Sequence, residues 1–578
     1  MRVALLTEGA LPHPQRGTGA WCDRLAAGLP EHEFERYLLT TGPQGAGTAD
    51  DPATSAGQAL ALWGRRPGGR APGALRRRQY AGAYEQLVRA LVLPGGRAGF
   101  GPGLYRLAVL AREDGTLPAF LASAPARRIL ERTWRLPGAD TSAGQPLVRD
   151  VLVAADLLEQ CLRPLSAPWY GTGPGGLGAA DLCHVVGGGL AALPALVARH
   201  LHGVPFVVTE HGLHLREQYL GYPPRAEGCA GAESEERQAR DERRSEERRQ
   251  RVRAPGGEWA SHEAPYRWPV RALLLSFFRA LTEETYRQAA VLTPGSAHDQ
   301  QWQRRCGADP ARTRVVYEGT PAVERPAAGP EPAAPTLVWA GALEPGRDPG
   351  LVLHAFAKVR AELPGARLVV YGEETAPGYR AHCAAVAERL GVAPAVDFAG
   401  RPGDLAEVWE AGTVAVFSAL SQRGPRLLAD AMLSGRAVVS TDVGVAREVV
   451  GPTGLLVPAR DPRALAGACL ALLRDGERRA RLGLAGRLRA QERFAVEPVV
   501  GAFREIYLEL VSQYPAFPGG GGGPVPRPFA RPAEYWLADG PRGGRDGARE
   551  DADGSTGARE DAPGSTGARE PAALAEAV

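Results

Sequence analysis

Lysine is almost absent from this sequence, which also lacks a concentrated excess of basic residues, paired cysteines and long apolar runs. Lys358 is the only lysine among 68 basic residues, and 65 acidic residues leave a net charge of only +3. A protein dedicated to nucleic acid carries a concentrated basic face, which a balanced mixture of charges does not provide. We therefore expect no nucleic-acid partner.

Paired cysteines and long apolar runs are lacking as well. The seven cysteines are scattered and never form a CxxC pair, so neither a disulfide framework nor a metal site is expected. No window reaches the roughly 18 uncharged apolar residues of a membrane-spanning helix. The apolar run in MRVALLTEG is too short for a secretory signal. These features predict a cytoplasmic protein, with peripheral membrane association left open.

The first half of the chain opens like a doubly wound domain. Arg2–Thr7 has the composition of a buried strand and is followed by a Gly/Pro-rich loop and a predicted helix at about residues 20–29. Two further buried strands are predicted at Asp181–Val186 and Pro205–Thr209, with a helical run at Leu190–His200 between them. This alternation predicts an α/β domain with a parallel sheet.

The boundaries of the first domain follow from composition. We assign residues 1–321 to it, although the helical stretches within residues 45–150 cannot be placed from the pattern. Residues 224–262 are rich in Glu and Arg, with acid-to-base pairs at helical spacing. We interpret them as a solvated surface insertion, with a partner-binding arm as the alternative.

A Pro/Ala linker at residues 322–335 separates a second domain, residues 336–498, which is followed by a terminal helix at residues 499–513. The tail, residues 514–578, contains five consecutive glycines and a near-decapeptide repeat, and we expect it to be disordered. The second domain again alternates strands and helices, with strands predicted at Thr336–Ala340, Arg367–Tyr371, Val414–Phe417, Ala437–Thr441 and Leu455–Val457.

One motif points to a different class and is set aside. Gly171–Gly176 satisfies the GxGxxG pattern of dinucleotide-binding proteins. It does not follow a predicted strand, and Pro174 interrupts it, so the strand-turn-helix setting that the motif needs is missing. We interpret the segment as a loop, and an NAD-type oxidoreductase is not expected.

Two segments of the second domain carry a family resemblance. Phe417–Val450, FSALSQRGPRLLADAMLSGRAVVSTDVGVAREVV, resembles the two-glutamate segment of retaining family 4 glycosyltransferases, with Gln422 and Asp430 at the two acidic positions. Gly341–Asp348 resembles the family's diphosphate-binding segment, with Ala342 where an arginine is typical. TDVG at residues 441–444 and GLLVP at residues 454–458 continue the resemblance in the family's order.

The first domain resembles a narrower group, the bacterial Pel-polysaccharide glycosyltransferases. The segment PFVVTEHG, residues 205–212, and the tripeptide Trp21-Cys22-Asp23 are similar to marks of that group. The resemblance covers roughly residues 1–40, 180–220 and 265–512. It implies a GT-B fold, in which two doubly wound Rossmann-like domains face each other.

The resemblance implies transfer of a hexose from a nucleotide-diphosphate sugar, a UDP-sugar, to a saccharide or lipid-linked acceptor. Retention of configuration, and a reaction without metal or cofactor, are implied with it. The implied catalytic residues are His211, which would orient the sugar, and Gln422, which would face it. The implied donor-binding residues are Gly17, Gly341, Arg347 and Asp430. Arg16 is the cation that would compensate for Ala342.

The altered positions leave an alternative open. Ala342 removes a cation, and Gln422 replaces a carboxylate with a neutral amide, whereas Arg347 and Asp430 keep their charges. The alternative is a catalytically silent relative that acts as a binding or scaffold partner in polysaccharide synthesis. Each site residue also has a plainer interpretation, as a core histidine, a turn glycine or a solvated polar side chain.

Overall fold

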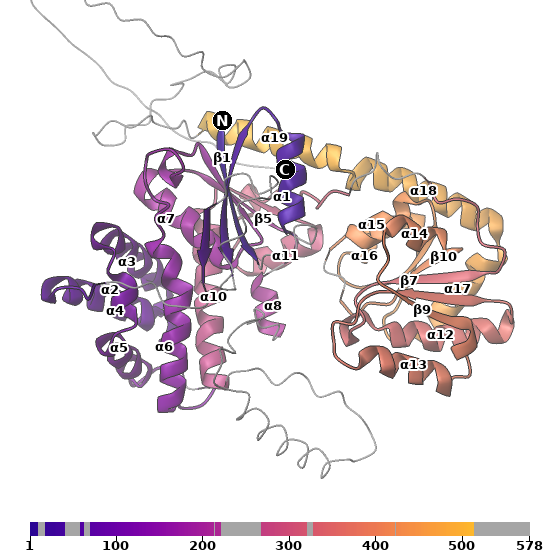
Figure 1. The fold of residues 1–578 in the computed structure, drawn as a ribbon, viewed down its shortest axis with the longest axis horizontal. Coiled ribbons are helices and arrows are strands. Elements are labelled where there is room, and N and C mark those ends of the chain that lie inside the picture. Colours follow the sequence, from indigo (N-terminus) through magenta and orange to yellow (C-terminus); the bar gives the residue numbers. More distant parts are fainter. Residues whose placement is uncertain are drawn as a thin grey trace, which may run out of the picture. The chain divides into compact units, whose positions relative to one another are not determined.

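Two six-stranded parallel sheets, each covered by helices, form the protein (Figure 1). The computed structural model describes residues 1–9, 18–40, 58–62, 70–140, 142–212, 214–220, 267–320, 327–421 and 424–513. The predicted insertion at residues 224–262 and the predicted tail at residues 514–578 lie outside these ranges, and the linker is described only from residue 327. Within the described helices, none has the length and apolarity needed to cross a membrane.

The first sheet has the strand order β3-β2-β1-β4-β5-β6. Its strands β4 and β5 are buried along their whole length, as expected for strands with helices on both faces. The strands predicted near residues 2, 181 and 205 are confirmed, whereas β2, β3 and β6 were not predicted. The bounds are β1 Arg2–Gly9, β2 Glu33–Thr40, β3 Gln58–Ala61, β4 Leu182–Val186, β5 Phe206–Glu210 and β6 Val291–Pro294.

Helices form most of the described part of residues 45–150, the stretch that the sequence pattern could not place. Between Ala74 and Leu162 the chain forms α2 to α6, which gather beside the first sheet in Figure 1 and share one core with it. The rings of Tyr80 and Phe120 stack there at 5.3 Å between centroids. The helices of this domain are α1 Thr18–Gly28, α2 Ala74–Val92, α3 Phe100–Asp114, α4 Leu117–Leu121, α5 Ala124–Trp134, α6 Val148–Leu162, α7 Ala192–His202, α8 His214–Leu220, α10 Trp268–Gln288 and α11 Ala297–Arg305.

The second sheet has the order β12-β11-β10-β7-β8-β9. All five strands predicted here are confirmed, and only β9 was not predicted. The strands are β7 Thr336–Ala340, β8 Arg367–Tyr371, β9 Val396–Gly400, β10 Val414–Phe417, β11 Ala437–Thr441 and β12 Leu455–Val457. The helices are α12 Pro349–Glu362, α13 Tyr379–Arg389, α14 Leu405–Glu410, α15 Arg426–Leu433, α16 Ala446–Val450, α17 Pro462–Arg474, α18 Gly476–Phe494 and α19 Val496–Gln513.

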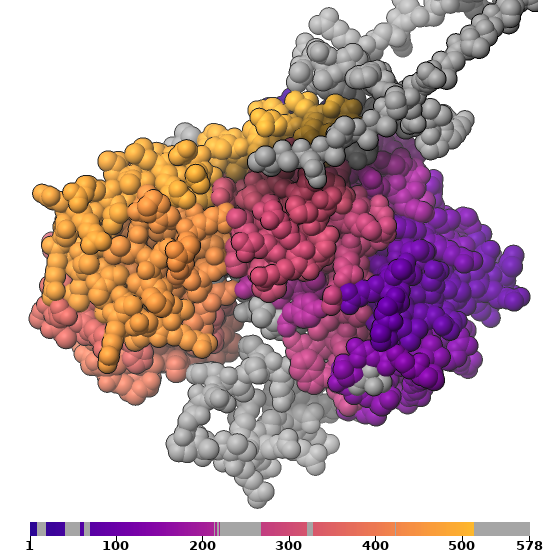
Figure 2. All heavy atoms as spheres, turned by 180° about the vertical axis from the view of Figure 1, so that it is seen from behind, coloured from indigo at the N-terminus to yellow at the C-terminus, as the bar shows by residue number. Residues whose placement is uncertain are grey.

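The last helix returns to the first domain. Phe503 and Tyr507 of α19 pack in the same core cluster as Trp21 of α1, and the Tyr507 hydroxyl lies 2.5 Å from Nδ1 of His184 in β4. By their contacts, the described residues of the two domains belong to one compact unit. Figure 2 shows the outer faces of α18 and α19 in yellow. The sequence predicted this helix, and the structure shows which core it completes.

Candidate functional site

Each sheet reverses its strand order once, and such a switch point is where open α/β sheets bind ligands. In the second sheet the reversal lies between β7 and β10. The loops that follow these strands are joined there by hydrogen bonds. Ser418 Oγ donates to the Arg347 carbonyl at 2.9 Å, and the Leu420 amide donates to the Gly346 carbonyl at 3.0 Å. The two segments that carry the family resemblance therefore form one structural edge.

Gly341 and Arg347 both lie in the loop after β7. A Cβ at Gly341 would come within 3.1 Å of the Trp339 ring, so a side chain there would displace a buried indole. Arg347 ends a short 3-10 helix, Pro345–Arg347, with its Nε 3.9 Å from Glu344 Oε1. The structure thus places both residues at the carboxyl edge of the second sheet, and their donor-binding roles stay predictions.

The helix after β10 begins at Arg426, and its N-cap residue, Pro425, makes no side-chain cap hydrogen bond. Asp430 lies one turn further along and is fully buried. Its Oδ2 accepts a hydrogen bond from Trp409 Nε1 at 2.7 Å. The ribose-binding role of Asp430 stays a prediction, and its burial favours a structural role. Gln422 lies outside the described residues.

The switch point of the first sheet lies between β1 and β4 and is lined by an acid and glycines. Glu8, near the end of β1, accepts a hydrogen bond from the Leu190 amide at 3.0 Å through its Oε2. Burial raises the pKa of Glu8 to about 7, against the lowering effect of backbone amide donors. Gly189 has φ +63, and a Cβ there would lie 3.0 Å from that oxygen. Arg16 and Gly17, in the loop after β1, lie outside the described residues.

His211 follows β5 at the same edge, where it was predicted. Its ring packs edge-on against Trp21 at 4.9 Å between centroids. Burial lowers its pKa, so the imidazole is neutral near pH 7. Nε2 is buried and has no hydrogen-bond partner among the described residues. An unsatisfied buried nitrogen is costly, which marks this atom as one that a ligand would satisfy.

His184 shows what a core histidine looks like in this fold. It is fully buried, with Tyr507 Oη at 2.5 Å and Thr209 Oγ1 at 2.6 Å from its two ring nitrogens. Burial lowers its pKa to about 3. Because both nitrogens of His184 are satisfied, the contrast with His211 supports a site position for the latter.

Residues from both sequence halves gather around His211. A Cβ built on Gly424 would lie 3.8 Å from the His211 carbonyl oxygen and 3.7 Å from Glu318 Oε2. Trp21 Nε1 donates to the Glu318 carbonyl at 2.8 Å and so fixes that residue beside α1. The loop before α15 therefore lies next to the edge that carries His211.

Sequence reasoning missed several charged residues here. Arg24, Arg426 and Glu8 were not predicted, since each reads as an ordinary polar residue in its local pattern. Glu8 could have been noticed, because an acid at the carboxyl end of a first buried strand is exposed to the switch point. Glu210 was also missed; it is buried and accepts from Tyr286 Oη at 2.5 Å and Gln303 Nε2 at 2.7 Å.

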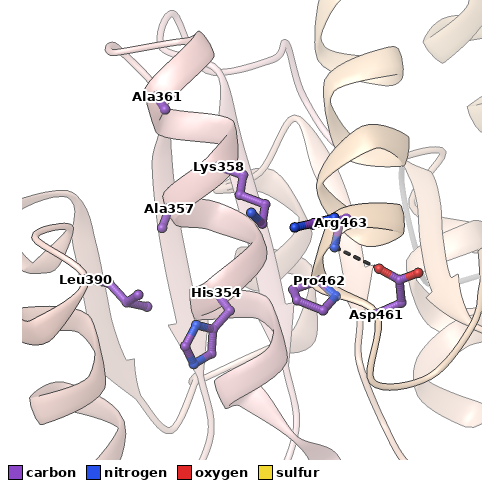
Figure 3. A pocket seen from close by; sticks show the side chains of 8 residues that line it. All are labelled: His354, Ala357, Lys358, Ala361, Leu390, Asp461, Pro462 and Arg463. Carbon is purple, nitrogen blue, oxygen red and sulfur yellow. Dashed lines mark hydrogen bonds between the residues drawn. The ribbon is translucent and has the colours of Figure 1, made fainter.

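A separate cavity of about 630 Å³ lies between α12 and α17 of the second domain (Figure 3). Lys358 of α12 and Arg463 of α17 extend toward one another across it, beside His354. None of the predicted site residues lines this cavity. We therefore place the functional site at the strand edges and not in this cavity. The loop interpretation of residues 171–176 is confirmed, because no strand precedes them. Among the described residues, no group of three His, Cys, Asp or Glu side chains could hold a metal ion.

Comparison with known proteins matches two family models to successive parts of the chain. Residues 1–311 match "Domain of unknown function (DUF3492)", and residues 334–475 match "Glycosyl transferases group 1". The D-inositol 3-phosphate glycosyltransferase of Segniliparus rotundus is 30% identical over 223 residues, which are 36% of this chain and 48% of that protein. The protein of the same name from Acidothermus cellulolyticus is 31% identical over 226 residues, 35% of this chain and 50% of that protein. The chain thus spans about half the length of the curated relatives it matches.

The crystal structure of Anabaena HepE in complex with UDP is similar in fold. It aligns with 88% of this chain and 99% of its own, at a TM-score of 0.51 and 13% sequence identity. The likeness and the two parallel sheets confirm the predicted GT-B fold. Since the first family model covers 311 of the 578 residues, the chain belongs to the DUF3492 family and carries a glycosyl transferases group 1 domain behind that region.

Proposed function

We propose that the protein is a retaining glycosyltransferase that transfers a hexose from a UDP-sugar to a saccharide or lipid-linked acceptor, without a metal or cofactor. The observation that carries the proposal is the switch point of the second sheet. Its two joined loops lie in the domain that matches the glycosyl transferases group 1 model. Membership of family 4 and of the Pel-polysaccharide group is part of the same proposal and rests on the motifs at residues 205–212 and 417–450.

The donor's diphosphate is expected at the start of α15. The first amides of a helix point outward without intrahelical partners, and the helix dipole favours an anion there. The residue at the N-cap of α15, Pro425, makes no side-chain cap hydrogen bond, so among the described residues these amides can serve a ligand. The crystal structure of HepE, which is similar in fold, is a complex with UDP, and this supports uridine as the base.

The chemistry follows from charge placement. The bond between the sugar C1 and the diphosphate oxygen breaks while a bond from C1 to the acceptor oxygen forms on the same face. The acceptor's proton passes to the departing diphosphate, so no further reactant is needed. Catalysis then depends on stabilising the charge that develops on the diphosphate. Arg347 and the α15 amides would supply that stabilisation.

His211 would hold the sugar. Its neutral imidazole keeps a ring nitrogen without a partner among the described residues, at the edge where the acceptor and the sugar meet. The Trp21 ring fixes its orientation. The described cysteines are all free thiols, which fits the reducing cytoplasm that we propose as its compartment.

A catalytically silent relative, acting as a scaffold in polysaccharide synthesis, is the second candidate. It is favoured by Ala342, which carries no cation, and by Asp430, whose Oδ2 accepts a hydrogen bond from Trp409 inside the core. Such a relative would bind a nucleotide or saccharide without turning it over.

Calorimetry with UDP, other nucleoside diphosphates and their sugars tests the proposal. We expect UDP to bind, and Ala342→Arg to tighten its binding by restoring a charge-assisted hydrogen bond. Failure of every nucleotide to bind would refute the glycosyltransferase. Binding without nucleotide release in the presence of acceptors would favour the silent relative.

A further inference from the structure

Arg24 is a half-buried arginine, and two of its guanidinium nitrogens have no hydrogen-bond partner in the described part of the chain. It lies on α1, and its Nε and Nη2 are buried without a hydrogen-bond partner among the described residues. The surrounding wall is formed by Trp21, Glu318 and valines of α19, including Val499. Buried guanidinium nitrogens are normally satisfied, because an unpaired charged donor loses its hydration without compensation. This side chain is therefore arranged for a group that the described residues do not supply.

A second arginine lies close to the first. Arg426 is the first residue of α15. A Cβ on Gly424, two residues before Arg426, would lie 3.7 Å from Oε2 of Glu318, and Glu318 lines the same wall as Arg24. Consistent with this placement, burial lowers the pKa of Arg24, the charge of Arg426 lowers it further, and Glu318 opposes the effect. No ion pair joins either arginine to a carboxylate within the described part of the chain. Two like charges that approach in this way are stabilised by an anion that bridges them.

The surroundings place this pair beside the reacting edge. Arg24 lines the same wall as Trp21, whose ring packs against that of His211 at 4.9 Å between centroids. The domain that carries α15 is held to the first domain by Glu448, whose Oε1 accepts from the Ala297 amide at 2.9 Å and from Tyr317 Oη at 2.8 Å. The two arginines and the start of α15 therefore lie beside His211.

We propose that Arg24 and Arg426 form a two-arginine site that binds the diphosphate of the donor nucleotide, in place of the arginine that is missing at Ala342. The inference rests on the proposed glycosyltransferase function and names the residues of its phosphate site. Two guanidinium groups match the two negative charges of a nucleotide sugar's diphosphate, and their planar forks suit phosphate oxygens. When the sugar leaves, the extra charge on the diphosphate would strengthen the same contacts, which is the requirement for catalysis by differential binding.

The test compares binding of UDP and of inorganic pyrophosphate by the full-length protein and its variants. Arg24→Gln and Arg426→Gln are each expected to weaken both ligands by about tenfold or more. Arg304→Gln and Arg481→Gln, which change exposed arginines of the two domains, serve as matched controls and should bind like the unchanged protein. Circular dichroism and the Tm confirm that each variant is folded. Should Arg24→Gln fail to fold, Arg24→Lys keeps the charge and the buried stem, and a smaller loss is expected.

The outcomes separate this inference from the function on which it rests. If UDP binds and both glutamine variants bind it unchanged, the arginine site is wrong and the glycosyltransferase stands. If pyrophosphate binds through the two arginines but no nucleotide does, the anion site stands and the proposed function fails. If neither ligand binds the unchanged protein, both are overturned.

Discussion

Replacing Asp430 with alanine tests whether this residue supports the fold or contacts the donor. Its carboxylate is fully buried and accepts from Trp409 Nε1 at 2.7 Å. The substitution removes a charged acceptor and leaves the indole N–H without that partner inside the core. Losing such a partner costs about 1–3 kcal/mol. For a domain of this size, a loss of about 2 kcal/mol lowers the Tm by about 4–8 °C.

The assay combines thermal unfolding with calorimetry. We expect Asp430→Ala to lower the Tm of the transition of the second domain, while UDP affinity in the folded protein changes by less than about threefold, or about 0.7 kcal/mol. Asp430→Asn keeps an oxygen acceptor of the same size and should lose less stability. Trp409→Phe removes the donor, so the double variant should lose less than the sum of the two single changes.

A different pattern would refute the structural role. If Asp430→Ala keeps the Tm but weakens UDP at least about tenfold, with pyrophosphate affinity unchanged, the carboxylate contacts the ribose. Asp430 would then have the ribose-binding role that the resemblance to family 4 implies, and its carboxylate would become accessible when the nucleotide binds.

Three further predictions follow from packing, burial and composition. His184 has a pKa lowered to about 3 by burial, so the unfolded chain binds the extra proton below about pH 6.5. The free energy of unfolding should fall by up to about 1.4 kcal/mol per pH unit from this group between pH 6.5 and 3, and His184→Gln should reduce that slope in acid titrations. Gly483→Ala in α18 places a Cβ 2.1 Å from the Gly435 carbonyl oxygen and should cost about 1–3 kcal/mol in urea unfolding, whereas Gly467→Ala in α17 meets nothing within 4 Å and should not destabilise. An amine-reactive label should modify one internal position, Lys358, without changing UDP affinity, because that side chain lies in the cavity between α12 and α17; loss of affinity would contradict the placement of the site.

The strands that could be predicted from the sequence are those with a continuous run of apolar residues. Continuous apolar runs such as Val414–Phe417 are buried on both faces, so composition alone identified them. β2, Glu33–Thr40, has charged residues in its first half, and β9, Val396–Gly400, is a half-exposed edge strand. Neither presents the uniform apolar run by which the buried strands were recognised.

The site was predictable where backbone geometry determines it. The loops with Gly341 and Arg347, and His211 after β5, lie at carboxyl strand edges, and motif order was enough to place them. Arg24 and Asp430 could not be interpreted in this way, because their environment comes from elements far away in the sequence. Valines of α19 pack beside Arg24, and Trp409 donates a hydrogen bond to Asp430. Contacts made by other elements therefore decide which partners each side chain can bind.

The most direct test of the central claim is nucleoside diphosphate release from a panel of nucleotide sugars, with proton NMR of the anomeric proton of any product. We expect acceptor-dependent release from a UDP-sugar, with the product keeping the donor's configuration. His211→Ala should lower the rate about 100-fold or more in a folded protein, as expected for a group that stabilises the transition state. Tight UDP binding without release from any donor, across saccharide and lipid-linked acceptors, would contradict the account.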